Sequence, residues 1–124
     1  MAQYFLTVPG DATEEPTLAS LHETNPAELE ALVAAVGRVN TDLHEAGVFV
    51  QAGGLHPPST AVTIDATGTE AKRVPGPFVT APEYLSGFWI IDVPDREAAL
   101  TWAERCSAAA RSRIEVRALQ GGAE

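Results

Sequence analysis

The chain of 124 residues is long enough for one domain (1–124), which would bury about two-thirds of the surface that its unfolded form exposes. Its formal net charge of -9 argues against nucleic acid as a partner, because binding to phosphates requires a basic face. No apolar run approaches the roughly 20 residues of a membrane span, so we expect a protein that binds no membrane. The opening residues lack a secretory pattern, and the single Cys106 cannot form an internal disulfide. Both features lead us to expect a cytoplasmic protein.

The first predicted element is a strand over residues 2–8, which is rich in Tyr, Phe, Thr and Val and ends at Pro9 and Gly10. Residues 11–25 carry no sustained periodicity and predict a loop. His22 lies in this loop, and nothing in its surroundings indicates a role beyond exposure to solvent.

A long amphipathic helix is predicted next, over residues 26–46. Asn25 can accept hydrogen bonds as its N-cap, and Pro26 suits the first turn. Apolar residues then recur at spacings of three and four until Gly47 favours a C-terminal stop; they are Leu29, Leu32, Val33, Val36 and Leu43. Gly37 costs about 1 kcal/mol relative to Ala inside a helix, so its presence predicts close packing there.

The remaining elements follow in chain order: strands over 48–52, 60–65, 70–74 and 85–93, a helix from 94 to 110, and a strand over 113–119. The run 85–93 is the most hydrophobic and predicts a central strand. The segment 74–84 carries three prolines, which predicts a shaped loop at a sheet edge and not a sheet interior.

This order predicts an α+β fold of the ferredoxin-like βαββαβ type with an extra hairpin. The antiparallel sheet would carry both helices on one face and leave the other face without a cover. On the first strand Tyr4, Leu6 and Val8 alternate with Gln3 and Phe5, so neither face is purely polar. Because an uncovered and partly apolar sheet face needs a partner, we expect a homodimer.

Several stretches, taken in this order, resemble the YCII-related family, especially the branch named for an Asp-Gly-Pro-Phe motif. They are residues 40–54, 55–63, 76–78, 87–92, 98–102 and 114–118. The resemblance covers nearly the whole chain from the first helix onward. It implies a dimeric α+β barrel and, for some members, a small-molecule enzyme without a cofactor. Other members are encoded beside sigma factors or fused to them.

The chain also departs from the pattern of this branch. Pro75 stands where the motif has Asp, and residues 79–83 (VTAPE) replace the usual Ala-Glu-Thr-Lys-Glu. A helix histidine is a proposed base in the wider family, and that position falls at about Val36 here. Any activity must therefore use other residues, or it has been lost.

We predict His56, Glu83 and Tyr84 as catalytic residues. His56 follows a strand and is held by Pro57 and Pro58, where it can act as a general base near neutral pH or simply be solvated. Glu83 and Tyr84 precede the central strand. A carboxylate against aromatic walls can transfer protons and a phenol can donate to a developing oxyanion; the alternative is a polar loop end with an aromatic packing anchor.

We predict Asn40, Phe78, Phe88 and Trp89 as substrate-binding residues. Asn40 falls on the apolar face of the first helix, where its amide needs partners. It can orient a substrate carbonyl, or it can tie the helix to the sheet. The three aromatic residues offer large apolar walls, although such residues are also typical of a core.

Other polar residues are assigned structural roles. We expect His44 to cap the end of the first helix and Asp42 to be exposed to solvent. We interpret Asp92 as part of the cap of the second helix. Cys106 reads as a packed or surface thiol and not as a nucleophile. No metal-ligand spacing and no phosphate-binding glycine loop occurs in the sequence, so we expect neither a metal nor another cofactor.

Two functions follow as hypotheses. The first is a cofactor-independent isomerase, lyase or cyclase that acts on a small apolar or aromatic metabolite, in a pocket between the uncovered sheet and the 74–84 loop. The second is a non-catalytic binding or regulatory module of the kind associated with sigma factors. A structural partner subunit is a third. A biosynthetic gene neighbourhood would favour the enzyme.

Overall fold

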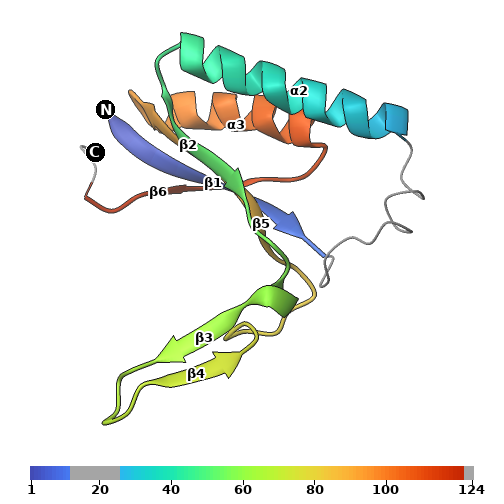
Figure 1. Ribbon diagram of the computed structural model, residues 1–124. Coiled ribbons are helices and arrows are strands. Elements are labelled where there is room, and N and C mark those ends of the chain that lie inside the picture. Colours follow the sequence, from blue (N-terminus) through green and yellow to red (C-terminus); the bar gives the residue numbers. More distant parts are fainter. Residues whose placement is uncertain (12–25, 122–124) are drawn as a thin grey trace.

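The computed structural model describes residues 1–11 and 26–121. The elements within them are β1 (Ala2–Gly10), α2 (Pro26–Glu45), β2 (Phe49–Gly54), the short 3-10 helix η1 (Pro58–Thr60), β3 (Val62–Asp65), β4 (Lys72–Pro75), β5 (Tyr84–Val93), α3 (Arg96–Ala110) and β6 (Glu115–Ala118). Four of these strands form an antiparallel sheet in the order β2-β5-β1-β6, and β3 pairs with β4 alone. Both helices lie on one face of the larger sheet (Figure 1). The expected ferredoxin-like α+β fold is confirmed, with β5 in the interior of the sheet.

The core lies between the sheet and the two helices. Along β1 and β5, Tyr4 pairs with Ile91 and Leu6 with Trp89, and all four side chains are buried on the helical side. The helices contribute smaller side chains; those that are buried are Val39 and Leu43 of α2 and Ala99, Ala103, Cys106 and Ala109 of α3. The alternation of buried and partly exposed residues along β1 is therefore as the sequence indicated.

The opposite face of this sheet has no helix over it among the described residues (Figure 1). We call it the open face; its apolar residues are Phe5, Phe88 and Ile90. Across β1 and β5, Phe5 pairs with Ile90 and Phe88 pairs with Thr7. The rings of Phe5 and Phe88 stack with their centroids 5.5 Å apart. The chain therefore presents aromatic surface on the side that its helices do not cover.

Two strands of the sheet run further than the sequence predicted. β1 continues through Pro9 to Gly10, past a register shift between Val8 and Pro9. Because β6 pairs with β1 only from Tyr4 to Thr7, β1 is an edge strand at this end, and an edge tolerates proline. β2 continues through Gly53 to Gly54, where a Cβ on Gly53 would lie 3.4 Å from the Phe88 ring.

β3 and β4 form a hairpin that projects from the body of the molecule (Figure 1). The prediction of a return strand over 70–74 is wrong by one or two residues at each end, since β4 runs from Lys72 to Pro75. Pro75 pairs with Val62 at the base of the hairpin. Proline is tolerated there because each strand of a two-stranded hairpin has an edge that needs no partner.

α2 begins at Pro26 as expected, whereas the predicted cap Asn25 and His22 lie outside the described residues. The predicted long amphipathic helix is present, but only part of its apolar stripe is buried. Leu29 is 44% exposed and Val33 is 64% exposed, and burial is restricted to the second half of the helix. The first half of α2 extends beyond α3, so α3 does not cover it (Figure 1).

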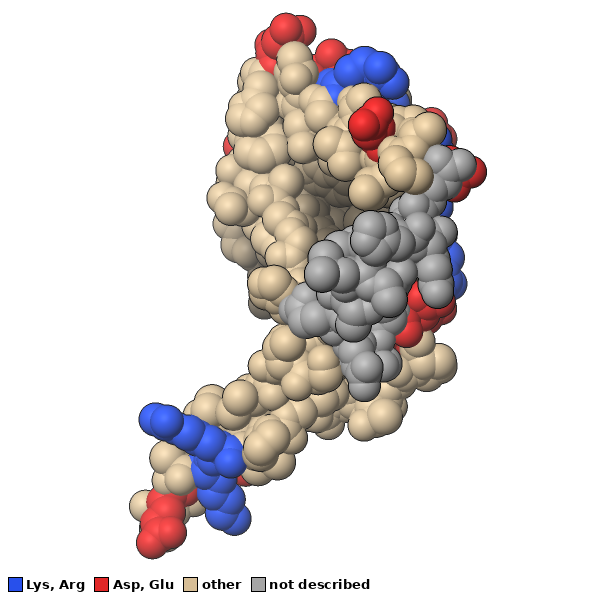
Figure 2. Space-filling model, turned by 45° about the vertical axis from the view of Figure 1, so that its right-hand side comes forward, with Lys and Arg blue, Asp and Glu red and all other residues tan. Residues whose placement is uncertain are grey.

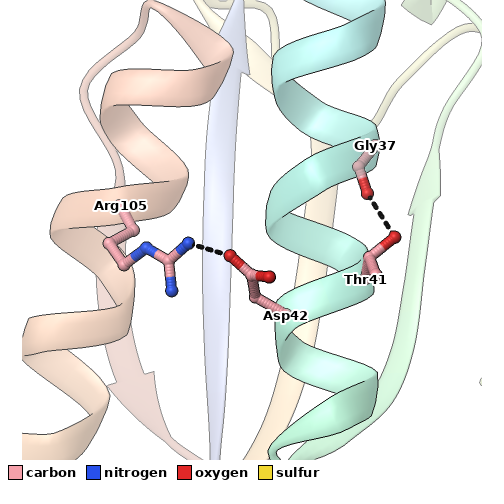
Figure 3. A network of polar contacts seen from close by, with 4 residues as sticks. All are labelled: Gly37, Thr41, Asp42 and Arg105. Carbon is pink, nitrogen blue, oxygen red and sulfur yellow. Dashed lines mark hydrogen bonds and ion pairs between the residues drawn. The ribbon is translucent and has the colours of Figure 1, made fainter.

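Two further expectations about α2 are corrected. A Cβ on Gly37 would meet nothing within 4 Å, so Gly37 does not mark close packing. Its carbonyl oxygen accepts a hydrogen bond of 3.0 Å from Thr41 Oγ1. Asp42 is not merely solvated, because its carboxylate forms an ion pair with Arg105 of α3, which joins the two helices (Figure 3).

The cap of α3 is Asp95, whose carboxylate accepts a 2.8 Å hydrogen bond from the backbone N–H of Ala98. The interpretation of Asp92 as part of this cap is wrong, since Asp92 belongs to β5. Its Oδ1 atom is buried and has no hydrogen-bond partner in the described part of the chain. None of the described helices is both long and apolar enough to cross a membrane.

Candidate functional sites

The residues predicted to form one site are divided between two pockets. The first, which we call the hairpin pocket, has a volume of about 620 Å³ and lies between the segment before β3 and the segment after β4; it is lined by His56, Phe78, Glu83 and Tyr84 among others. The second, the helix pocket, has a volume of about 360 Å³ and lies between α2 and the sheet; it is lined by Asn40, Phe88 and Trp89. All three predicted catalytic residues therefore share one cavity, whereas three of the four predicted substrate-binding residues line the other.

The walls of the hairpin pocket are mainly apolar and are supplied by Leu55, Pro57, Pro58, Val62, Phe78, Val79 and Leu85. Hydrogen bonds hold the two proline-rich segments together. Thr63 Oγ1 donates to the carbonyl of Gly76 at 2.8 Å, and the N–H of Gly76 donates to the carbonyl of Ala61 at 2.7 Å. Gly76 has a φ of 105°, which only glycine adopts readily. The prolines thus shape a wall of a cavity, as the sequence of the 74–84 segment indicated.

The second segment is fixed by its own turn. The hydroxyl of Thr60 donates to the carbonyl of Pro57 at 2.7 Å, and the N–H of Thr60 donates to the same oxygen at 3.0 Å. Pro57 is buried, while the preceding His56 is exposed at the pocket wall. The imidazole is therefore carried by a constrained turn and remains accessible to a ligand.

Glu83 has a partner that the sequence did not reveal. Its carboxylate accepts a hydrogen bond from the guanidinium of Arg113, just before β6, and this contact raises the pKa of Arg113. Glu83, Tyr84 and Arg113 also line a third pocket of about 560 Å³, together with residues 7–9 of β1. Arg113 lies two residues after Arg111 in the sequence, and this short basic pair does not indicate a contact with a carboxylate 30 residues earlier.

In the helix pocket, the indole N–H of Trp89 donates to Oδ1 of Asn40 at 2.6 Å. This bond ties α2 to β5, which is one of the two roles expected for Asn40. Since an indole nitrogen can only donate, the amide oxygen must face Trp89, and the amide NH₂ group is left as a donor at the pocket wall.

The floor of the helix pocket contains Gly53, Gly54 and Gly87. Val36 lines it beside Asn40, and the resemblance puts the helix histidine of the wider family at about this position. This part of the pocket wall is apolar in the chain. Figure 2 shows that the body of the molecule is hollowed on the side that it presents to the viewer.

Other candidate groups lie outside these pockets. His44 stacks on Phe49, with ring centroids 4.0 Å apart. Cys106 is fully buried, and burial raises the pKa of its thiol to about 11, so it is protonated near neutral pH and is not a nucleophile. Within residues 1–11 and 26–121, no group of three or more His, Cys, Asp or Glu side chains is placed to hold a metal ion.

The architecture defines the chain as a ferredoxin-like α+β protein with one cavity beside its β3–β4 hairpin and another between α2 and the sheet. The family model of the YCII-related domain matches residues 13–120, and the chain belongs to this family. A search among curated proteins gave no match to the chain.

Proposed function

We propose that the protein is a cofactor-independent enzyme that transfers protons on a small apolar or aromatic metabolite bound in the hairpin pocket, as an isomerase, lyase or cyclase. One observation carries this proposal: segments far apart in sequence bring His56, Glu83 and Tyr84 to one cavity with mostly apolar walls. Such a combination of an apolar cavity with a few convergent polar groups is typical of ligand sites.

Each polar group has a role suited to its position. His56 takes a proton from the substrate, because an imidazole nitrogen can accept a proton and the constrained turn keeps this side chain at the wall. The Tyr84 hydroxyl donates to the oxygen that gains charge. Glu83 forms an ion pair with Arg113 and serves as a proton acceptor or as an anchor for a substrate hydroxyl. Phe78 is 87% exposed and offers a ring that a bound aromatic molecule would cover.

A non-catalytic binding module is the second candidate, and the engaged polar groups favour it. Glu83 is paired with Arg113, the Asn40 oxygen is occupied by Trp89, and Val36 replaces the base of the family. If these groups serve only the structure, the hairpin pocket binds its ligand without changing it.

Proton exchange with solvent distinguishes the two candidates without knowledge of the full reaction. The protein is incubated in D₂O with a panel of aromatic and aliphatic ketones and aldehydes, and deuterium uptake beside the carbonyl is followed by NMR. A proton-transfer enzyme labels one class of probe. His56→Ala should lower the rate about 10²- to 10⁴-fold, as expected for loss of a general base, and Glu83→Gln should lower it as well.

His44→Ala is the matched control, since this histidine is exposed but lies outside the hairpin pocket. It should exchange like the wild-type protein. Probe binding without exchange would support the binding module, and exchange that is unchanged in both His56→Ala and Glu83→Gln would refute the catalytic assignment.

A further inference from the structure

A notch at the edge of the sheet forms a cavity to which the proposed function assigns no role. β6 pairs with β1 only as far as Thr7, which lies opposite Glu115, whereas β1 continues to Gly10. The third pocket, of about 560 Å³, lies in this notch, and we call it the edge pocket. Its volume is within the roughly 300–1,000 Å³ that is typical of ligand sites.

An ion pair spans the notch. On one side, Glu83 precedes Tyr84, which pairs with Gly10 near the end of β1. On the other side, Arg113 precedes β6, and β1 lies between β5 and β6 in the sheet. The Arg113 guanidinium donates to the Glu83 carboxylate through one nitrogen atom. This contact therefore joins the starts of β5 and β6 across the end of β1, at the rim of the edge pocket.

The charges that line the edge pocket do not cancel. Its charged side chains are Glu83, Glu115 and Arg113. Arg113 is paired with Glu83, whereas the Glu115 carboxylate forms no ion pair within the described part of the chain. The next cation along β6, Arg117, is not part of the lining. One negative charge is left over, and the net charge of -9 on the whole chain adds to its attraction for a cation.

Most of the remaining lining is apolar and fits a hydrocarbon body. The apolar residues of the lining are Val8, Pro9, Leu85 and Ile114. Ile114 also packs against the core, so this part of the wall is fixed in place. The Tyr84 ring lies over Gly10, because a Cβ on Gly10 would be 3.4 Å from Cζ of Tyr84. An aromatic ring beside a carboxylate favours an organic cation, since its face attracts an ammonium group.

Two other kinds of occupant fit this notch less well. A peptide strand added to β1 beyond Thr7 needs the backbone N–H groups of the free edge, and Pro9 has none. A metal ion needs more ligands than the pocket offers, because no three His, Cys, Asp or Glu side chains within residues 1–11 and 26–121 are grouped to hold one. The notch therefore suits a small organic molecule.

We propose that the edge pocket binds a small organic ammonium ion, which is a primary or secondary amine with an aliphatic or aromatic body. Such amines are protonated near neutral pH, as the lysine side chain is. The ammonium group donates to the Glu115 carboxylate, and the body covers Leu85 and Ile114. The pair of Glu83 and Arg113 stays intact at the rim. The proposal does not depend on the proposed enzymatic activity, because neither Glu115 nor Arg113 lines the hairpin pocket.

Three probes of similar shape test the need for a positive charge: 2-phenylethylamine, 2-phenylethanol and 3-phenylpropionate. Dissociation constants are measured by NMR titration of the full chain at neutral pH and low salt, with methyl groups as reporters. The amine should bind about 10-fold more tightly than the alcohol, and the acid should bind most weakly. The methyl signals of Ile114 should shift, whereas those of Val62 and Val79 in the hairpin pocket should not.

Three results of these titrations would overturn the proposal. The first is equal affinity for the amine and the alcohol, which would mean that the pocket selects only shape. The second is the absence of amine binding at about 10 mM, far above the affinity of a charged and partly apolar contact. The third is a set of shifts confined to Val62 and Val79, which would place the amine in the hairpin pocket.

Two substitutions should change the affinity for 2-phenylethylamine in opposite directions. Glu115→Gln removes the charge and keeps the shape, so it should raise the dissociation constant about 5- to 10-fold. Arg113→Gln removes a positive charge and leaves the Glu83 carboxylate unpaired, so it should lower the constant about 2- to 5-fold.

Glu104→Gln is the matched control, since it removes one negative charge from the exposed side of α3, outside the edge pocket. It should bind the amine like the wild-type protein. A disturbed fold would weaken binding in every variant, so weaker binding by Arg113→Gln, or equal affinities of Glu115→Gln and Glu104→Gln, would contradict the proposal.

Discussion

The hydrogen bond from Trp89 to Asn40 allows a quantitative prediction about stability. Asn40→Ala removes the acceptor and leaves the indole N–H of Trp89 without a partner, although this side chain is only 5% exposed. An unsatisfied buried donor costs about 1–3 kcal/mol. Alanine returns up to about 0.7 kcal/mol through its better helix propensity. We therefore expect a net loss of about 1–2 kcal/mol in the free energy of unfolding.

Trp89→Phe removes the donor from the same pair. Together with Asn40→Ala and the double variant, it allows the energy of this hydrogen bond to be separated from the other effects of each substitution. Its own cost, about 1–2 kcal/mol, comes mainly from the smaller ring, because the Asn40 amide lies at a pocket wall where water can reach it. The double variant should be more stable than the sum of the two losses implies, since the second change removes a bond that is already broken. The coupling energy should be about 1 kcal/mol.

Urea denaturation followed by far-UV circular dichroism measures all four proteins, because tryptophan fluorescence would be altered by the Trp89→Phe change itself. A loss of 1 kcal/mol should also lower the melting temperature by about 3–6 °C for a chain of this size. A coupling energy within about 0.3 kcal/mol of zero would refute the view that this bond ties α2 to the sheet.

Three further predictions use the same measurements. Gly37→Ala should stabilise the fold by about 0.5–1 kcal/mol, because alanine favours a helix and the new Cβ meets no other atom. Gly47→Ala should destabilise the fold by about 1–2 kcal/mol, because φ is 72° at this position. The midpoints of urea denaturation measure both changes in stability. Burial raises the pKa of the Cys106 thiol from 9.0 to about 11, so the stability that comes from the protonated buried thiol is present below pH 9 and is lost as the pH rises to 11. The wild-type protein should lose about 2–3 kcal/mol more than Cys106→Ala over that interval, and parallel pH profiles would contradict this. Asp42→Asn should cost less than about 1 kcal/mol and still less in 0.5 M salt, because its ion pair with Arg105 is partly exposed; urea titrations at two salt concentrations check this.

The strands of the sheet could be predicted because each is determined by a pattern within a few consecutive residues. Tyr4 and Leu6 alternate with Phe5 along β1, and this alternation alone assigns the two faces of the strand. The length and hydrophobicity of β5 place it between other strands, since only an interior strand buries so many residues. Asp95 caps α3 and Pro26 begins α2, as short signals at helix starts predict.

The extent of packing on α2 was not predictable in this way. A stripe of apolar residues shows which side of a helix turns inward, but it does not show where the layer beneath the helix ends. Leu29 and Val33 fit the stripe and are nevertheless exposed, and Gly37 has no neighbour that would explain its small size. Contacts between distant residues are equally hidden, as the pair of Glu83 and Arg113 shows.

The candidate site is divided into two pockets because its residues lie far apart along β5. Tyr84 and Trp89 belong to one extended strand and are five residues apart, which corresponds to about 17 Å at 3.3–3.4 Å per residue. A small metabolite that contacts Tyr84 therefore does not contact Trp89 in the same cavity. Asn40→Ala should accordingly weaken the fold but leave the affinity for a probe in the hairpin pocket unchanged within about twofold at a temperature where the variant is folded. A larger loss of affinity would mean that the two pockets are coupled through β5.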